Sequence, residues 1–350
     1  MFIGDTALPP AIVPQTEEIH KCFSGSVIAN LEGGIAEPEA ASLGQAKLFN
    51  APAVLDYLND LNVRVVSLAN NHVLDIERSP ARTVGLLAQR GIQTCGAGDN
   101  FEQAAKPAIL EEDGRELVFL AFGWEPIGCR AAGVGRPGAN PLRPKHVLRS
   151  VESARAAHPD AVITLLMHWN YELELYPQPM HRQLAFAAID AGANAIVGSH
   201  SHCVQGVEVY KQAPVVYGLG NWFLPHGEFF GGKLTYPDLC LRELAFEWEP
   251  DTSHMICHWF EYERERHRLT YVKSEGPGDS EWITELTPFA GMSRSDYVDW
   301  FCRSRRKRML LPVYRHYDDA ACNWGKDRWV ALRNWAIGRL VDSGAKQGPR

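Results

Sequence analysis

The stretch ANAIVGSHSH, residues 193–202, joins a short apolar run to a pair of histidines. The apolar part predicts a buried strand that ends just before His200 and His202. In extended backbone, side chains two residues apart point to the same side, so this spacing predicts two imidazoles that face one point. Imidazole is the commonest side-chain ligand for zinc-like ions. An ordinary surface position explains an isolated pair equally well, so a metal site needs partners from elsewhere in the chain.

Other short apolar runs in the chain also end in side chains that bind metals. Asp5 follows residues 1–4, Glu32 follows 27–31, Asn71 and His72 follow 65–69, and His168 follows 161–167. A turn or a helix cap explains one such polar residue taken alone. In open α/β sheets, however, the reactive groups gather just outside the strand ends. The set as a whole therefore predicts a metal site at one edge of the sheets.

Several longer motifs lie around these residues. They are GDTAL (4–8), ANLEGGI (29–35), LANNHVLD (68–75), MHWNYELELYP (167–177), GSHSHCVQGVEVY (198–210) and VYGLGNW (216–222). In this order, from about residue 1 to residue 221, the chain resembles the bacterial capsule-synthesis, poly-γ-glutamate-associated (CapA-like) proteins. These proteins are a branch of the calcineurin-like metallophosphoesterase superfamily.

The resemblance implies a metal site and a proton-transfer group. One or two divalent ions (Mn, Zn, Fe or Ca) would be bound by Asp5, Glu32, Asn71, His168, His200 and His202. His72, beside Asn71, would act on the substrate as an acid or base. Two positions depart from the superfamily pattern, because Ala7 replaces a histidine ligand and Glu32 replaces an aspartate. We therefore expect a mononuclear or unequal site, and phosphoester hydrolysis does not follow from the fold alone.

Composition and charge favour a cytoplasmic enzyme. The chain has 350 residues, of which 45% are hydrophobic, and a formal net charge of −7, which argues against a general nucleic-acid binder. Its eight cysteines include no Cys-x-x-Cys pair and are expected to be reduced. No apolar run reaches about 18 residues, so no integral membrane segment is expected, and strand-like residues at the very start predict no signal peptide.

One basic segment, from Arg303 to Arg308, stands out against the acidic net charge. Such a run is typical of a solvated helix face, and the alternative is a docking site for an acidic peptide, a polyanion or a membrane surface.

The order of the predicted elements indicates an α/β fold. Predicted helices over 51–61, 79–90, 144–157 and 177–191 alternate with the strands named above. From residue 206 the pattern changes to strands, over 206–210, 215–218, 239–249, 254–264 and 267–273. We expect a four-layer α/β/β/α sandwich of two mixed sheets in a domain spanning 1–275. A helical C-terminal extension, 276–350, would follow a linker-like SEGPGDS segment, with helices over 293–308 and 326–341.

Three loops are expected to shape a substrate pocket: the loop after His168, the segment 218–238, and the segment 128–144, whose Arg130, Arg136 and Arg143 are candidates to hold a carboxylate or phosphate. The loop after His168 offers Glu172 as a catalytic carboxylate, while Trp169 and Tyr171 form either a recognition wall or core packing. The segment 218–238, rich in glycine and aromatic residues, predicts a lid over a peptide-like ligand. Candidate substrate contacts are Trp169, Tyr171, Arg130, Asn221, Trp222 and Phe229.

The sequence leaves three functions open. The first is hydrolysis of a phosphoester or amide by a metal-activated water, with His72 and Asn71 in the catalytic machinery. The second is metal-assisted α-proton transfer, which the resemblance links to epimerisation of peptide precursors in ribosomal-peptide (lasso-type) pathways. The third is a non-catalytic role in assembling a capsule or poly-γ-glutamate polymer.

Overall fold

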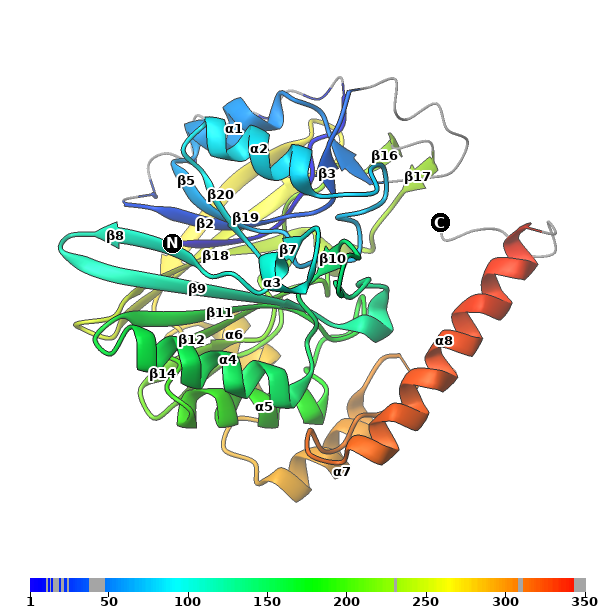
Figure 1. Ribbon diagram of the computed structural model, residues 1–350. Helices are drawn as coiled ribbons and strands as arrows, with labels where there is room; N and C mark the ends of the chain where they lie inside the picture. The colour runs from blue at the N-terminus through cyan, green and yellow to red at the C-terminus, as the bar shows by residue number, and fades with distance from the viewer. Residues whose placement is uncertain are drawn as a thin grey trace.

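The computed structural model describes two mixed β-sheets that face each other, with helices on their outer sides (Figure 1). The predicted α/β/β/α sandwich is therefore confirmed. The residues described are 1–10, 12, 14, 19, 22–23, 25–37, 48–229, 232–307 and 311–342.

In the first sheet, the strands from the N-terminal part of the chain pair in parallel, and the strands from residue 242 onward pair antiparallel. Its order is β20-β19-β18-β1-β2-β5-β6, and a further strand, β15, also pairs with β1. These strands span Phe2–Thr6 (β1), Val27–Leu31 (β2), Val63–Ser67 (β5), Gln93–Cys95 (β6), Asn221–Phe223 (β15), Arg242–Glu249 (β18), His254–Glu263 (β19) and Arg268–Glu275 (β20). Because β1, β2 and β5 run parallel, their carboxyl ends meet at one edge of the sheet.

The second sheet has the order β13-β14-β12-β11-β9-β8. Its strands span Ala108–Glu112 (β8), Arg115–Gly123 (β9), Val162–His168 (β11), Ala195–Ser199 (β12), Val207–Tyr210 (β13) and Ala213–Val216 (β14). The central strands are parallel, and His168 pairs with Ser199 at their carboxyl ends. The short pairs β3 (Gly34–Ile35) with β4 (Phe49–Asn50), β7 (Ala97–Gly98) with β10 (Gly138–Ala139), and β16 (Gly227–Phe229) with β17 (Gly232–Leu234) lie outside the two large sheets.

The helices lie close to their predicted positions. They span Val54–Asp60 (α1), Ala81–Gln89 (α2), Phe101–Ala104 (α3), Pro144–Ala157 (α4) and Pro179–Asp190 (α5). Helix α5 begins at Pro179, two residues later than Pro177. Pro179 takes the first helical position, where no backbone donor is needed. In Figure 1, α1 and α2 lie above the first sheet, and α4 and α5 lie below the second.

The core consists of an apolar layer between the sheets and two layers beneath the helices. The central layer joins Phe2 and Trp259 of the first sheet to Phe119, Leu166 and Val197 of the second. Burying each such side chain contributes roughly 1.5–3 kcal/mol relative to leaving it in water. The two sheets are thereby held face to face, which fixes the relative positions of their strand ends.

The C-terminal helices begin after β20 and span Glu281–Leu286 (α6), Arg294–Ser304 (α7) and Ala320–Asp342 (α8). On α7, Tyr297 packs beneath the guanidinium of Arg182, which binds Glu208 through Nε at 2.6 Å and Nη2 at 2.7 Å. Residues of α7 therefore share the core under the second sheet.

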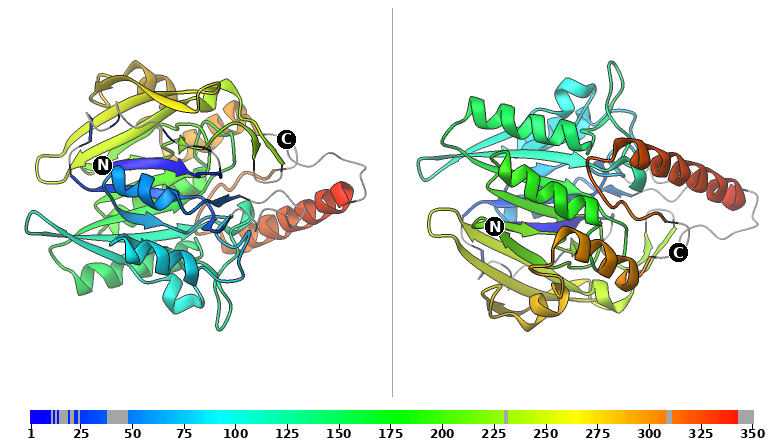
Figure 2. Two further views of the ribbon diagram at one scale, coloured as in Figure 1. Left: turned by 90° about the horizontal axis from the view of Figure 1, so that it is seen from above. Right: turned by 90° about the horizontal axis from the view of Figure 1, so that it is seen from below.

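Helix α8 projects from the body of the molecule (Figures 1 and 2). Its Val330 is buried, whereas Trp324 and Trp335 are each 63% exposed. In the residues that the structure describes, no helix has both the length and the apolar character needed to cross a bilayer.

Candidate metal centre

The polar residues predicted at the strand ends converge between the carboxyl edges of the two sheets. Asp5 is on β1, Glu32 directly follows β2, and Asn71 lies in the loop after β5. His168 ends β11, and the histidine pair follows β12. The parallel registers of β1 with β2 and of β11 with β12 bring these positions together.

Three of these side chains form a compact buried cluster. One ligand atom each of Asp5, Glu32 and His168 lies within 4.8 Å of the other two. His168 Nε2 is 3.5 Å from Glu32 Oε1 and 2.8 Å from Asn71 Oδ1. The structure therefore brings four predicted ligands, carried by both sheets, to one point.

His200 and His202 adjoin this cluster, although not as an extended pair. Strand β12 ends at Ser199, and the backbone φ angles of the two histidines are 87° and 55°, both in the left-handed region. Within β12, a Cβ on Gly198 would lie 2.1 Å from the Tyr217 carbonyl oxygen, so the backbone approaches Tyr217 at a point where only glycine fits. The predicted extended backbone is wrong. The two rings still lie 5.8 Å apart, and the His200 ring is 4.8 Å from His168.

One amide, which donates two hydrogen bonds, and one hydroxyl orient the cluster. Asn30 Nδ2 donates to Asp5 Oδ1 at 2.8 Å and to Glu32 Oε1 at 3.1 Å. His168 Nδ1 is 2.9 Å from Ser199 Oγ. Such partners fix the ring orientation of a ligand histidine and the aim of a ligand carboxylate. The sequence analysis missed Asn30, although its i, i+2 spacing to Glu32 is a signal that could have found it.

The histidine pair is anchored separately. The His200 backbone N–H donates to Asp5 Oδ2 at 3.0 Å. His202 Nδ1 lies 2.9 Å from Asn221 Oδ1 and 3.3 Å from Asp5 Oδ2. Asn221 was predicted to contact substrate, whereas the structure places it against His202 as a buried orienting amide.

Burial dominates the electrostatics of the centre. It raises the pKa of Glu32 to about 8, and the nearby Asp5 charge adds to the effect. Burial, with the neighbouring imidazoles, holds the pKa values of His168 and His200 well below their usual range. At His202 burial lowers the pKa, but the Asp5 hydrogen bond and charge outweigh it and raise the pKa to about 9. Without a cation, burial therefore favours the protonated form of Glu32, and the protonated form of His202 is favoured beside Asp5.

The donor set fits a divalent ion. Glu32 Oε2 and His200 Nδ1 are buried and have no hydrogen-bond partner in the described part of the chain. Leaving such groups unpaired costs about 1–3 kcal/mol each, and more for charged groups. Carboxylate and amide oxygens together with imidazole nitrogens suit ions such as Mn²⁺, Fe²⁺ and Zn²⁺. Ala7, the position where the resemblance led us to look for a histidine ligand, is fully buried in an apolar cluster with Leu48 and offers no metal-binding side chain.

Two titratable groups lie on the accessible side of the centre. The His72 side chain is 30% exposed, and its Nδ1 lies 2.8 Å from Asp75 Oδ2. Burial lowers the pKa of His72, but the hydrogen bond and charge of Asp75 together with the charge of Glu32 outweigh it, so the pKa is raised. Glu172 is 53% exposed, and its Oε1 lies 4.0 Å from His202 Nε2.

Most of the aromatic residues proposed to contact substrate belong to the core instead. Trp222 is fully buried, with its ring 4.9 Å from that of Phe260. Trp169 is also fully buried and stacks on His181 at 5.1 Å. Tyr171 is 4% exposed and donates to the Pro312 carbonyl at 3.3 Å. Side chains buried in this way offer no surface to a substrate, which corrects the predicted recognition wall.

The other predicted contacts differ in position. Arg130 is exposed and lies two residues after Gly128. A Cβ added to Gly128 would lie 3.5 Å from the Cβ of Asn71. Phe229 ends β16, but its side chain lies outside the described part of the structure. The lid segment does reach the centre through Tyr236, whose ring lies 4.7 Å from that of His202. Sequence reasoning included Tyr236 in the lid but did not assign it to the site.

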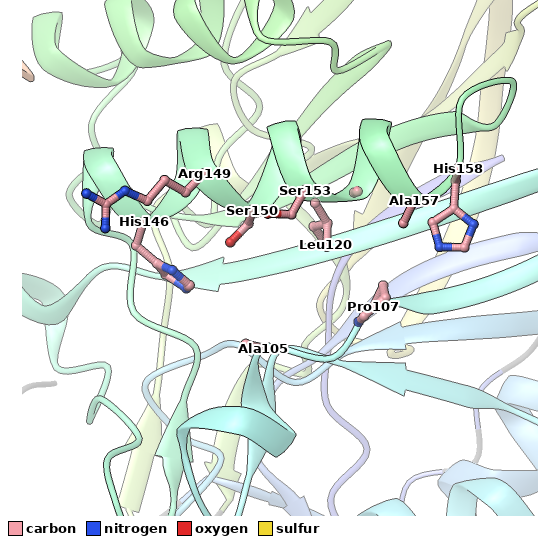
Figure 3. Close-up of a pocket in the computed structure, with 10 residues that line it drawn as sticks. Ala105, Pro107, Leu120, His146, Arg149, Ser150, Ser153, Ala157 and His158 are labelled. Atoms are coloured by element: carbon pink, nitrogen blue, oxygen red, sulfur yellow. The ribbon is translucent and has the colours of Figure 1, made fainter.

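A separate groove of about 380 Å³ runs along α4 and β9 (Figure 3). Both of its histidines already have protein partners, since His146 Nε2 is 2.7 Å from Asn140 Oδ1 and His158 Nδ1 is 2.8 Å from Glu116 Oε2. None of the residues that line it belongs to the metal centre.

Two bacterial proteins with described functions are similar in sequence to part of this chain. A protein from Bacillus anthracis described as "Capsule biosynthesis protein CapA" is 30% identical over 167 residues, 47% of this chain and 40% of its own. A Bacillus subtilis (strain 168) protein described as "PGA biosynthesis protein CapA" is 33% identical over 172 residues, 49% of this chain and 45% of its own. The match thus spans less than half the length of either relative.

Solved structures give a weaker likeness. A 5'-nucleotidase precursor from Thermus thermophilus aligns over 74% of this chain and 46% of its own, with 12% identity and a TM-score of 0.38. The family model described as "Bacterial capsule synthesis protein PGA_cap" matches residues 15–225, which include every predicted metal ligand except Asp5. The chain belongs to this bacterial capsule synthesis (PGA_cap) family.

Proposed function

We propose that the protein is a metal-dependent enzyme that cleaves an amide or phosphoester bond in a peptide-like substrate. The observation that carries the proposal is the buried Asp5–Glu32–His168 cluster, in which Glu32 Oε2 has no protein partner among the described residues. Asp5, Glu32, Asn71, His168, His200 and His202 would hold the ion. A divalent ion at such a centre supplies Lewis-acid polarisation and lowers the pKa of water.

The residues of the chain supply proton transfer and orientation. Asp75 accepts from one ring nitrogen of His72 and so fixes the ring and favours its protonated form. In the proposed hydrolysis, a water oxygen forms the new bond to the carbonyl carbon or phosphorus. As the scissile bond breaks, the other ring nitrogen of His72, Nε2, donates its proton to the leaving group. Asn30 and Asn221 keep the carboxylates and His202 in fixed orientations.

A peptide-like, carboxylate-bearing substrate is the class we favour. The named relatives are described as capsule and PGA biosynthesis proteins, and that description supports a polymer or peptide substrate for this chain as well. Because the match covers less than half of those relatives, the substrate of this chain is part of the proposal.

Epimerisation is the second candidate, and it is favoured by one specific feature. Two proton-transfer groups, His72 and Glu172, are both partly exposed beside the centre. Such a pair could serve removal of an α-proton by one group and its return by the other. A third role, polymer assembly without turnover, requires neither group to act.

Incubation of the metal-loaded protein with acidic peptides in deuterated water tests all three. Appearance of cleavage products supports hydrolysis, deuterium in an intact peptide supports epimerisation, and neither outcome with retained binding supports assembly. His72→Ala and the chelated protein should lose the activity. His158→Ala, whose ring pairs with Glu116 along the separate groove, is the matched control and should keep it.

A further inference from the structure

The basic segment singled out in the sequence divides into residues with different roles. Arg305 is 5% exposed, and its Nη2 donates to the Leu311 carbonyl at 2.9 Å, so its charge is used within the fold. Arg306 is exposed and Lys307 half-buried. Within the described ranges, neither of their side chains has a hydrogen-bond or ion-pair partner. Arg308 lies outside the described residues.

A buried carboxylate holds the backbone of this pair in place. Glu174 is fully buried, and its two oxygens accept the backbone N–H groups of Arg306 at 3.0 Å and Lys307 at 2.9 Å. Hydrogen bonds to an ionised acceptor are about twice as strong as neutral ones. The two side chains therefore start from a fixed piece of main chain.

The loop that carries Glu174 also belongs to the metal centre. It begins at His168 and carries Glu172, which approaches His202. The Glu174 carbonyl accepts from Gln205 Nε2 at 2.7 Å and from Cys203 Sγ at 3.4 Å, and Cys203 directly follows His202.

We propose that Arg306 and Lys307 form a docking site for a carboxylate of an acidic peptide-like substrate, which they hold beside the metal centre. The inference rests on the proposed function, because it assigns the substrate class of the same site. Glu172, which is 53% exposed beside the centre, adds a carboxylate that repels an anionic chain at short range. Two cations fixed at its side offset that repulsion and favour substrates that carry a negative charge away from the reacting bond.

A small anionic ligand fits this pair better than a membrane surface does. Binding to anionic lipid takes a polybasic patch of several cations. In the described part of this segment, Arg306 and Lys307 are the two cations whose side chains have no partner among the protein's described residues. The net charge of the whole chain is −7. Both residues lie beyond the family match, which ends at residue 225. The docking site is thus a property of this chain's C-terminal part.

Binding of a fluorescein-labelled hexaglutamate, measured by anisotropy on the full chain, tests the proposal. The double variant Arg306→Gln/Lys307→Gln should bind it about tenfold more weakly, the scale expected for two exposed charge contacts. The matched control is Lys145→Gln/Arg149→Gln, which removes the same charge at exposed positions of α4, and of these two residues Arg149 lines the separate groove (Figure 3). The control should bind as the wild type does, and the salt dependence should be weaker in the first variant only.

Several outcomes would overturn the docking site. They are an equal loss in both double variants, no loss in either, no hexaglutamate binding by the wild type, or a loss seen only with anionic vesicles. Repeating the titration after chelation separates this inference from the proposed function. Turnover should disappear without the metal, whereas the difference in affinity between the two double variants should remain. If the metal-loaded protein shows no turnover but the difference persists, the proposed function fails and the docking site stands.

Discussion

Replacing Glu32 by Gln tests whether this buried carboxylate carries the charge that a cation would offset. In the metal-free protein, burial and the nearby Asp5 raise its pKa to about 8 from 4.5. The unfolded chain releases the proton near pH 4.5, whereas the folded chain keeps it until about pH 8. The contribution of Glu32 to stability is therefore fully present below pH 4.5 and is lost as the pH rises through 8.

The pKa shift sets the size of the expected effect. Across this window the free energy of unfolding should fall by about 1.4 kcal/mol per pH unit because of Glu32, or roughly 5 kcal/mol in all. Glu32→Gln has no titrating group at this position. Between pH 5 and pH 8, the metal-free variant should therefore gain about 4 kcal/mol on the metal-free wild type. With metal bound the order should reverse, because the variant lacks a charged ligand.

Urea denaturation followed by tryptophan fluorescence, at several pH values and with a chelator, measures this difference. Glu172→Gln is the control, because that carboxylate lies near the same centre but is 53% exposed. The gain of about 4 kcal/mol should be absent from this variant, because an exposed charge contributes little to stability. If the pH profile of Glu32→Gln is parallel to that of the wild type, Glu32 ionises in the folded chain as it does in water, and the argument from its burial is refuted.

Three further predictions concern single residues of the centre and its surroundings. His200→Ala should weaken metal binding by more than about a hundredfold, because altering a group that only orients a ligand already costs roughly tenfold to hundredfold. Unchanged metal content by elemental analysis would remove His200 from the ligand set. His72→Ala should keep the metal and lose about a hundredfold in turnover, whereas a parallel loss of metal would make it a ligand. Trp222→Ala should lower the free energy of unfolding by about 3–5 kcal/mol and leave substrate affinity unchanged in the folded variant; weaker affinity at full stability would restore its proposed recognition role.

The fold was predictable because its elements carry strong local patterns. The apolar runs before Asp5, Glu32 and His168 are strands, and the predicted helix at 144–157 coincides with α4. The same runs predicted that these side chains lie together, since the carboxyl ends of parallel strands meet at one edge. The position of a strand end depends mainly on neighbouring residues, so the local hydrophobic pattern of the sequence predicts it well.

The errors arose where the outcome depends on packing between distant segments. Trp222 adjoins a glycine-bearing loop, yet β15 pairs with β1 and turns its ring into the core. The left-handed backbone of His200 lies in the turn directly after β12, and the sequence around it gives no local sign of this conformation. Tyr236 reaches His202 only because the lid segment folds back over the centre. Composition identified the aromatic residues but not which of them face the site.

The position of β1 in the middle of the first sheet has a consequence for folding. One of its edges pairs with β2, but the other must wait for β15 and β18, which follow much later in the chain. One of the two hydrogen bonds described for the Asp5 carboxylate comes from His200, 195 positions away. During synthesis β1 therefore has an unpaired edge, which is prone to association with other chains until the far strands arrive. Closure over such distances is slow, so the metal centre should form among the last parts of the molecule, and added divalent ions should stabilise the finished fold rather than speed its early steps.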